Sequence, residues 1–489
     1  MRKRLFYLTM LSTMVVGCSA NGQSHFSEPN KEDEVGLIKE DVSIEFLCLT
    51  DSKYKVELDR MIDDFKKVEP HVTVNLINPP AAGNYNVLEK IVMSGFFKED
   101  YPDIVQCYPD NVVKYIDRGY ALNLDAYLNN SDYGLKDEKS DYIDSFLNEG
   151  ANYSVEGTYS LPFCKSTELM YYNADKLLNL DLSTIDSSIN NGKPLDRIYL
   201  DDLTWEELFQ KLCPAIKTYN ENQSEENKIY DDKIDDKGTP GIFTYDSDEN
   251  FFITLAEQYG YGYTSYDKNL GKGSIDFNNQ NMINLIKSFA QAKDNGYLQT
   301  KGSYGNYVSD LFIQRKSLFT VSSTAGLSYN YDSNNKMTIG VAKIPRPEGK
   351  DYSAINQGPS VCILDHKDEN RSLASFLFWK HITNKENSSS WAINTGYLGI
   401  RHSAYSSAEY LAALNPKDIN DLYAKAVSAN LKKIAEVSAN TFNTPVFKGS
   451  SNARTNVGML MANCLKSTDL DNEINDLFLE AAQDCESYL

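Results

Sequence analysis

Polar residues lie where two β-rich runs of the chain meet. The first run covers residues 157–163 and contains a proline next to its end, and the second covers residues 168–173. Between the two runs, Ser166 and Thr167 belong to a short polar elbow, and Glu168 begins the second run. A strand, an elbow and another strand are typical of a chain that leaves one lobe and enters another. We therefore expect these three side chains to face whatever binds between two lobes.

Two further pairs of polar residues follow predicted strands. Tyr108 and Asp110 come just after a short strand at residues 103–106, and Ser322 and Ser323 end a later strand. In open α/β sheets, ligands bind outside the carboxyl ends of the strands. Hydroxyl and carboxylate groups at such ends favour the binding of a polar molecule.

Catalytic and metal-binding patterns give little support for an enzyme or a metal site. Asp246, Asp248, Asn250 and Glu257 occupy four positions of a calcium-loop pattern, but Phe251 stands where the tight turn requires glycine. A helix that starts after Asp248 explains the same residues. The sequence contains no P-loop, no G-x-S-x-G elbow and no G-x-G-x-x-G motif. Carboxylates are plentiful, so a glycosidase pair remains an open alternative.

The chain before the elbow alternates strands with helices. Leu58, Met61 and Phe65 share one face of a helix, which is the amphipathic pattern of a helix packed on a core. A β-α-β-α-β order predicts a parallel sheet with helices on both faces. The predicted strands are at residues 42–49, 72–77 and 103–106, and the predicted helices are at 56–68, 85–94 and 112–118.

Beyond the elbow the chain again mixes helices and strands. Thr204 and Glu207 form a capping-box pattern that opens one helix. Residues 219–241 are acidic and poor in apolar side chains, which is typical of an insertion loop. The other predicted helices are at 251–259, 281–295, 308–315, 370–382, 418–436 and 455–465, and the other predicted strands are at 317–323, 337–344 and 360–364.

Length and composition predict a two-lobed globular protein. The chain has 489 residues, more than one ordinary core accommodates, and 41% of them are hydrophobic. Its net charge of −21 argues against nucleic acid and against an anionic membrane surface as partners. The cysteines that follow residue 18 are odd in number and form no CxxC pattern, so we predict mostly free, buried thiols. Trp205, Trp379 and Trp391 are expected to be packing residues.

The N-terminus predicts export and a lipid anchor. Residues 2–4 are basic, and the apolar run at 5–16 is short for a membrane-spanning helix but typical of a signal peptide. A small residue before Cys18 resembles a bacterial lipobox, in which the cysteine is acylated and the signal is cut just before it. We predict a signal peptide at residues 1–17, lipidation of Cys18 and a flexible tether at residues 18–41. The alternative is an ordinary signal peptide with a stray cysteine.

Six short motifs occur in order along residues 42–465. They are PDIV with GYALNL (102–105 and 119–124), GTYSLPF-CKST-ELMYYNADKL (157–177), TWEEL (204–208), KSLFTVSSTA (316–325), GVAKIP through Gly358 (340–358) and TGYLGIR (395–401). Each motif alone is weak, but six in this order are specific. Together they resemble the extracellular solute-binding proteins of ABC importers, the family that includes maltose-binding and glycerol-3-phosphate-binding proteins. Gly399 stands where that family usually has proline.

The resemblance implies a fold of class α/β. It is the two-lobed periplasmic-binding-protein fold of type II, in which each lobe is a mainly parallel sheet flanked by helices and a cleft separates the lobes. The chain would cross between the lobes near residues 162–168, 356–360 and 394–400. The expected lobes are residues 42–163 with 359–395 for lobe 1, and residues 164–358 with 396–489 for lobe 2.

The resemblance also adds three ligand residues. Gly358 would lie at the second crossing, where a missing side chain lets the backbone approach a ligand, and Tyr397 at the third. Arg454 matches an arginine that faces the ligand phosphate in the glycerol-3-phosphate branch. Its planar fork suits a phosphate, a carboxylate or a pair of sugar hydroxyls. The alternatives are a surface salt bridge for Arg454 and core or rim packing for Tyr108 and Tyr397.

Binding without catalysis is the function that the resemblance implies. The expected ligand is a carbohydrate or a polyol phosphate, held without a cofactor or metal. The expected partners are ABC permease subunits, and the chain would be a monomer anchored by Cys18 on the extracytoplasmic face of the cell membrane. A secreted carbohydrate-active enzyme and a peptide or polyamine receptor remain alternatives. A cleft lined mainly by carboxylates, without arginine, would favour the polyamine receptor.

Overall fold

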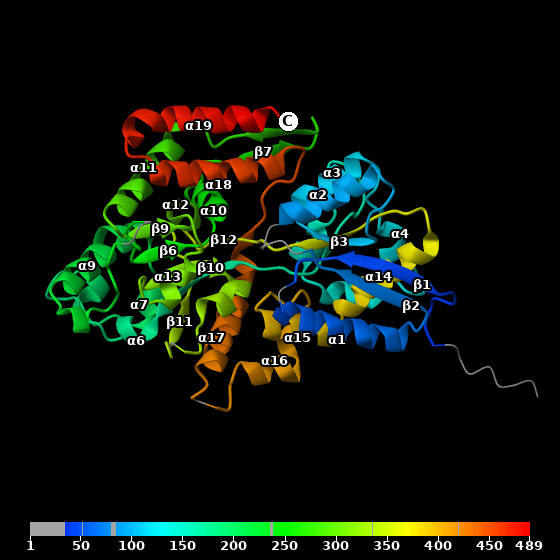
Figure 1. Ribbon diagram of the computed structural model, residues 1–489, viewed down its shortest axis with the longest axis horizontal. Coiled ribbons are helices and arrows are strands. Elements are labelled where there is room, and N and C mark those ends of the chain that lie inside the picture. Colours follow the sequence, from blue (N-terminus) through cyan, green and yellow to red (C-terminus); the bar gives the residue numbers. More distant parts are fainter. Residues whose placement is uncertain (1–34, 51, 80–84, 235–237, 335, 419) are drawn as a thin grey trace, which may run out of the picture.

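Two lobes lie side by side along the longest axis of the molecule, each with a sheet flanked by helices (Figure 1). The computed structural model describes residues 35–489 except 51, 80–84, 235–237, 335 and 419. The predicted signal peptide, Cys18 and the first part of the predicted tether lie outside the described residues. Within the described ranges, no helix combines the length and the apolar character needed to cross a membrane.

Lobe 1 is built on a five-stranded sheet in the order β2-β1-β3-β13-β4. Helices α1 and α14 pack against one face, while α2 and α3 lie on the other (Figure 1). Its strands are β1 (Val42–Leu47), β2 (Val72–Ile77), β3 (Ile104–Cys107), β4 (Leu161–Pro162) and β13 (Ser360–Ile363). Its helices are α1 (Ser52–Val68), α2 (Tyr85–Phe96), α3 (Pro109–Asp117), α4 (Asp125–Leu128), η1 (Lys136–Asp141), α5 (Asp144–Glu149), α14 (Glu369–Ile382) and α15 (Lys385–Thr395), followed by η6 (His402–Ser406) and α16 (Ala408–Ala413).

Lobe 2 is built on a second five-stranded sheet in the order β11-β5-β10-β6-β9, with a separate β7-β8 hairpin. Its strands are β5 (Glu168–Asn173), β6 (Phe243–Tyr245), β7 (Thr264–Asp267), β8 (Lys272–Ile275), β9 (Leu298–Thr300), β10 (Phe319–Ser323) and β11 (Ile339–Ala342). Its longer helices are α9 (Cys213–Glu221), α10 (Asp248–Tyr259), α11 (Gln280–Asp294), α17 (Leu422–Val437), α18 (Ser450–Lys466) and α19 (Leu470–Glu486). Its short helices are α6 (Ala174–Leu177), η2 (Ile189–Gly192), α7 (Arg197–Asp201), α8 (Trp205–Glu207), η3 (Leu208–Leu212), η4 (Glu225–Asn227), α12 (Lys301–Tyr304), α13 (Ser309–Ile313), η5 (Thr324–Asn330) and η7 (Ser438–Asn440).

Each sheet mixes parallel and antiparallel pairs, so the prediction of mainly parallel sheets is only half right. In lobe 1, β1 is parallel to β2 and β3, but β13 is antiparallel to β3 and β4. In lobe 2, β6 is parallel to β10 and β9, but β5 is antiparallel to β10 and β11. The strands β13 and β5 enter their lobes from the crossings, and they are the ones that run against their neighbours.

Two crossing segments lie side by side between the lobes. Ser166 and Gln357 form an antiparallel bridge in which each backbone N–H donates to the other carbonyl at 2.8 Å. Beside it, Gly358 has a φ of +96°, and a Cβ there would lie 2.0 Å from the carbonyl oxygen of Cys164. The glycine is therefore required by the close approach of the two crossings. A small parallel pair, β12 (Ala354–Ile355) with β14 (Thr441–Phe442), continues this junction.

The predicted third crossing, at residues 394–400, also lies at the junction. The backbone N–H of Leu398 donates to the carbonyl of Lys165 at 2.6 Å, and the N–H of Ile143 in lobe 1 donates to the carbonyl of Ile400 at 3.0 Å. The chain reaches the sheet of lobe 2 only with α17, which packs against β11.

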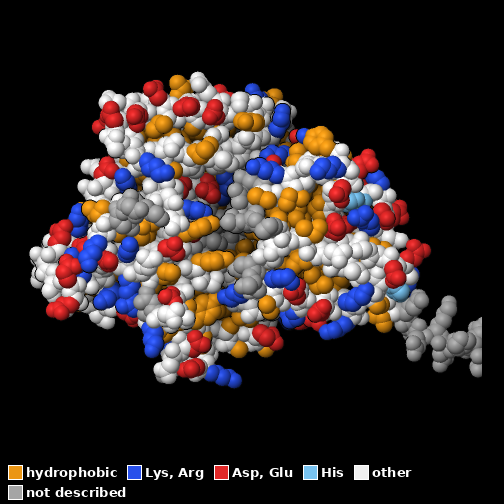
Figure 2. Space-filling view, viewed as in Figure 1, with side chains coloured by type: hydrophobic (Ala, Val, Ile, Leu, Met, Phe, Trp, Pro, Cys, Tyr) orange, Lys and Arg blue, Asp and Glu red, His pale blue; other side chains and the backbone are white. Residues whose placement is uncertain are grey.

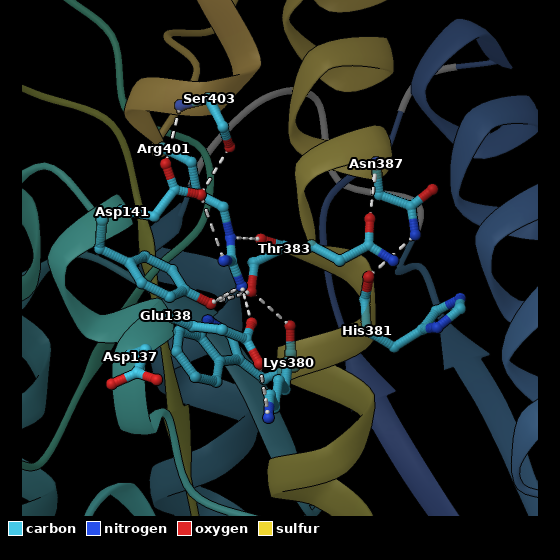
Figure 3. Close-up of polar contacts among 12 residues, drawn as sticks. Asp137, Glu138, Asp141, Lys380, His381, Thr383, Asn387, Arg401 and Ser403 are labelled. Atoms are coloured by element: carbon cyan, nitrogen blue, oxygen red, sulfur yellow. Dashed lines mark hydrogen bonds and ion pairs between the residues drawn. The ribbon is translucent and has the colours of Figure 1, made fainter. Parts of the chain in front are cut away.

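Arg401 fixes the end of this segment in lobe 1. Its side chain is 3% exposed, and its guanidinium donates to the carbonyl of Thr383 and to the hydroxyl of Tyr142, over whose ring it also lies. Nη2 lies 3.0 Å from a carboxylate oxygen of Glu138, and Nη1 lies 3.4 Å from one of Asp141 (Figure 3). Every side of the buried cation is thus matched by an acceptor, as a buried charge requires.

The end of the predicted tether is not flexible in the structure. Ile38 is buried, and the backbone N–H groups of Leu37 and Ile38 donate to the carboxylate of Glu69 at 2.9–3.1 Å. Because Glu69 accepts these bonds at the end of α1, residues 37 and 38 belong to the fold.

The predictions for the cysteines and the tryptophans are confirmed. The seven cysteines of the described chain are free and buried, and Trp205, Trp379 and Trp391 lie in the cores. Asp248, Asn250 and Glu257 of the calcium-loop pattern belong to α10, and Asp246 lies just before its N-cap Ser247, which accepts a hydrogen bond from the N–H of Asn250. Among the residues that the structure describes, no group of three or more His, Cys, Asp or Glu side chains is placed to hold a metal ion.

Candidate functional site

A cavity lies between the lobes, beside the two crossing segments. It contains about 370 Å³ of space not filled by protein atoms, including a part that opens to solvent. The surface that faces the viewer in Figure 2 is hollowed where the two lobes meet. The lining residues are Tyr108, Pro109, Asp110, Glu149, Asn356, Gln357, Gly358, Asn443, Thr444, Val446 and Arg454.

Arg454 brings a positive charge to this cavity from α18. It is half-buried, and its Nη2 donates to Oδ1 of Asn250 in α10. The guanidinium carbon lies 5.7 Å from the ring centre of Tyr108, within the range of a cation–π contact. No carboxylate oxygen of the described residues lies within 4.0 Å of its nitrogens. Burial acts to lower the pKa of Arg454, but the charges of Glu249 and Asp110 outweigh it and raise that pKa.

Asp110 places an unpaired negative charge on the same cavity. It lies in the first turn of α3, where the helix dipole favours a carboxylate. Its Oδ1 accepts a hydrogen bond from Oγ of Ser450 at 2.8 Å. Burial raises the pKa of Asp110, while the charge of Arg454 acts in the opposite direction. Arg454 and Asp110 thus face one cavity without forming a direct ion pair.

Tyr108 is held rigidly at the wall that it shares with Arg454. It is the N-cap residue of α3, and its ring packs edge-on against Tyr85 with ring centres 4.9 Å apart. Burial raises the pKa of Tyr108, so its hydroxyl stays protonated near neutral pH. An aromatic ring with a hydroxyl tip can contact both the apolar and the polar edge of a ligand.

A second carboxylate on the cavity wall is already neutralised. Glu149 ends α5, and its Oε2 accepts hydrogen bonds from Nζ of Lys165 and, at 3.2 Å, from Oγ of Ser360. Lys165 is completely buried on the first crossing. The pair therefore adds no net charge to the site.

Amide and hydroxyl groups complete the lining. Nδ2 of Asn356 donates to Oδ1 of Asn443 at 2.6 Å, while the buried Oδ1 of Asn356 has no hydrogen-bond partner in the structure. A buried acceptor without a partner is costly, so it is a natural place for a ligand hydroxyl. Thr444 stands beside Asn443, and Gln357 follows Asn356 on the second crossing.

Behind the cavity, a buried hydrogen-bond network joins lobe 2 to the crossings. Glu168, at the start of β5, accepts from the hydroxyl of Tyr245 and, at 2.8 Å, from Nδ2 of Asn250. The same Nδ2 donates to Oε1 of Gln357 at 2.5 Å. Burial raises the pKa of Glu168 to about 7, against the lowering effect of these hydrogen bonds.

The structure brings together some of the ten residues proposed from the sequence. Tyr108, Asp110, Gly358 and Arg454 line the cavity. Glu168 lies behind them and contacts Arg454 only through Asn250.

Besides Glu168, five of the proposed residues do not line the cavity. Ser166 and Thr167 tie the crossings together, since the Thr167 hydroxyl donates to the carbonyl of Ile355 at 2.9 Å. Ser323 caps η5 by accepting from the N–H of Ala325 at 3.3 Å, and Ser322 is buried. A Cβ on Gly326 of η5 would lie 2.2 Å from Oγ of Ser322. The hydroxyls of Thr167 and Ser323 thus bond within the fold, and the roles proposed for these four residues in ligand binding stay predictions.

Tyr397 belongs to an aromatic cluster rather than to the cavity wall. Its ring stacks on Trp391 with centres 6.1 Å apart and lies 5.7 Å from the ring of Tyr54. It is 9% exposed, so the packing alternative describes it better than a ligand role.

Sequence reasoning missed several lining and supporting residues. Glu149 ends a helix that was not predicted, and Asn250 was considered only as part of a calcium pattern. The run Asn356-Gln357 directly before Gly358 was the available signal, because polar residues next to a crossing glycine are exposed to the junction. No sequence pattern pointed to the partnership of Glu149 with Lys165.

The fold and the cavity define a two-lobed binding protein. Residues 60–417 match the family model described as bacterial extracellular solute-binding protein. The chain belongs to this family, whose members bind solutes and are not enzymes. No curated protein sequence matches the chain.

Solved structures share the fold at low sequence identity. UgpB from Mycobacterium tuberculosis in complex with glycerophosphocholine has a TM-score of 0.68 and 16% identity, covering 92% of this chain and 98% of that one. Maltose-bound MalE3 of T. maritima has a TM-score of 0.66 and 14% identity, covering 91% and 100%. The GacH receptor of Streptomyces glaucescens has a TM-score of 0.63 and 15% identity, covering 93% and 100%. At these identities the likeness shows the fold alone.

Proposed function

We propose that the chain is the solute receptor of an ABC importer and that it captures a carbohydrate or a polyol phosphate between its lobes. The single observation that supports this most is Arg454, a cation on the cavity wall that no carboxylate of the described chain neutralises within 4.0 Å. A buried or half-buried charge is stabilised by a partner, and a ligand group would supply the one that is missing here.

The charges on the cavity wall narrow the ligand class. Arg454 contributes one positive charge and Asp110 one negative charge, while Glu149 and Lys165 cancel each other. These charges sum to zero, so a neutral sugar leaves the wall balanced, and Asp110 would repel a ligand with one negative charge less than a phosphate monoester with two. A cavity that contains an arginine and one unpaired carboxylate does not suit a polyamine.

The uncharged groups suit a polyhydroxylated molecule. The unpartnered Oδ1 of Asn356 would accept from a ligand hydroxyl, and Tyr108 would pack on an apolar face beside Arg454.

Delivery to a membrane permease and anchoring through acylated Cys18 belong to the same proposal. The basic, apolar and small-residue pattern before Cys18 supports them. We further propose that the ligand stabilises the closed arrangement of the lobes, because it would contact both walls of the cavity at once. Mass spectrometry of the protein purified from bacterial membranes tests the anchor, which predicts diacylated or triacylated Cys18 as the first residue.

A thermal-shift screen on the chain without residues 1–18 tests the ligand class. We expect a neutral sugar or a phosphodiester to raise the melting temperature in a saturable manner. Arg454→Met should abolish the shift, and the exposed Arg118→Met in lobe 1 serves as the matched control. Saturable binding of spermidine, or an equal shift in the Arg454 variant, would contradict the proposal.

A further inference from the structure

Asn250 lies at the meeting point of three elements. It belongs to the first turn of α10 in lobe 2, and it is 3% exposed. Its Nδ2 group uses both hydrogens, one toward Glu168 at 2.8 Å and one toward Gln357 at 2.5 Å. Its Oδ1 accepts from Nη2 of Arg454. The side-chain amide of Asn250 thus forms hydrogen bonds with the start of β5, with the second crossing and with the arginine of the cavity.

The chemistry of Glu168 fixes which way this amide points. An ionised carboxylate only accepts hydrogen bonds, so the NH₂ side of Asn250 must face it. The carbonyl oxygen of Asn250 is then left facing Arg454, where it can accept from the guanidinium. Once Glu168 is protonated it can donate to Oδ1 of Asn250. The rotated amide would then present donors to Arg454, which carries only donors.

We propose that Asn250, oriented by Glu168, is a positioning residue that holds the Arg454 guanidinium in the cavity and couples it to the second crossing through Gln357. The crossing responds because Gln357 also pairs with Ser166 of the first crossing, at 2.8 Å in both directions. A ligand that engages Arg454 would thus act on the second crossing, one of the segments that join the lobes. The effect of a ligand in this inference rests on the proposed function. The positioning of Arg454 by Asn250 in the free protein does not.

Nuclear magnetic resonance of the free protein tests the positioning directly. The chain without residues 1–18, which keeps every described residue, is labelled with ¹⁵N-arginine, and hydrogen exchange is followed at the guanidinium N–H groups, which include the Nη2 donor that bonds to Asn250. Asn250→Ala should shift the Arg454 signal and remove its protection, while the Arg401 signal stays unchanged as an internal control. Asn220→Ala is the matched control, because Asn220 is equally buried but bonds within residues 220–232, away from the cavity. An Arg454 signal that is identical in Asn250→Ala and the wild type would overturn the proposal.

A pH series tests the part played by Glu168. Glycerophosphocholine is the probe, since its phosphodiester keeps one charge between pH 6 and pH 8. Glu168 faces Tyr245 from β6, Glu249 and Asn250 from α10, Arg454 from α18 and Tyr352, and Asp110 is a further carboxyl group on the cavity wall. Glu168→Gln cannot ionise and leaves all other groups in place, so the difference between the two proteins isolates Glu168.

We expect the wild type to bind the probe about fivefold more tightly than Glu168→Gln at pH 8, with the difference gone at pH 6. Equal affinities at both pH values would overturn the role of Glu168. If the wild type does not bind the probe at all, the ligand choice under the proposed function fails. In that case the arginine signals test the inference without a ligand, and they are recorded for the wild type and Glu168→Gln at pH 6 and pH 8. The inference is overturned if the Arg454 signal changes neither with pH in the wild type nor with the substitution.

Discussion

Two arginines of this protein sit in contrasting surroundings. Arg401, in lobe 1, is almost completely buried and is matched by Glu138, Asp141, a carbonyl and a tyrosine hydroxyl (Figure 3). Arg454, on the cavity wall, is half-buried and has one hydrogen bond, to the amide oxygen of Asn250. The first is a cation whose partners all come from the fold. The second is a cation that the fold holds in place without a carboxylate to neutralise it. This difference distinguishes an arginine that stabilises the fold from one that binds a ligand.

The largest effect is expected from removing the matched cation. Arg401→Met leaves the carbonyl of Thr383 and the carboxylates of Glu138 and Asp141 without their common donor. Loss of one partner from a buried pair costs about 3–5 kcal/mol, and the partial exposure of Glu138 places this case near the lower end. Urea unfolding of the variant measures the loss. A change below about 1 kcal/mol would remove the contrast between the two arginines.

Lys165 sharpens the comparison, because it is a fully paired cation that lies next to the cavity. Lys165→Met would leave the buried carboxylate of Glu149 uncompensated, and we expect a loss of about 3 kcal/mol in stability. The double variant Lys165→Met with Glu149→Gln should recover part of this loss. Absence of recovery would show that the packing of the lysine side chain, and not its charge, stabilises the junction.

Glu168 makes the stability of the protein depend on pH. Burial raises its pKa from 4.5 to about 7, so the folded state binds this proton more tightly than the unfolded chain. The stabilising contribution is present below about pH 4.5 and is lost as the pH rises through about 7. Relative to the wild type, Glu168→Gln should therefore gain on the order of 2 kcal/mol between pH 5 and pH 8. Urea unfolding at the two pH values measures this gain, and parallel stability curves would contradict it.

The smallest effect on stability is expected from Arg454→Met. The variant loses one hydrogen bond, to Asn250, so we expect a cost of about 1 kcal/mol in the absence of ligand. Thermal unfolding of the free variant provides the measurement. A cost as large as that of Arg401→Met would show that Arg454 stabilises the fold, and would leave its role in binding without support.

Local patterns in the sequence determine much of this fold. The strand at residues 72–77 and the strand at 168–173 were predicted with the bounds that the structure shows, because each is a short apolar run between clear turn residues. Helix α19 was missed, since its apolar positions are interrupted by acidic ones and it packs on α18 at the far end of the chain. Which strand pairs are parallel and which are antiparallel depends on the path of the chain between the lobes. The sequence of a single segment does not determine that path.

The cavity was less predictable than the fold. Residues placed by the strand-end rule, such as Tyr108 and Asp110, do line the cavity. Ser323 satisfies the same rule but caps η5, the helix that follows it directly, and Ser322 is buried and does not line the cavity. Whether a polar side chain at a strand end faces a ligand or caps the next turn depends on the tertiary neighbours. The partners of Glu168 and Glu149 lie far away in sequence, so spacing could not reveal them.

The most direct test of the account is a calorimetric titration of the chain without residues 1–18. Wild type and Arg454→Met are each titrated with maltose and with glycerophosphocholine, the ligands in two of the structurally similar proteins. The account predicts saturable one-to-one binding of at least one of them by the wild type, weakened at least about tenfold in the variant, which corresponds to about 1.4 kcal/mol. Equal affinity of the two proteins, or no binding of either ligand by the wild type, would contradict it.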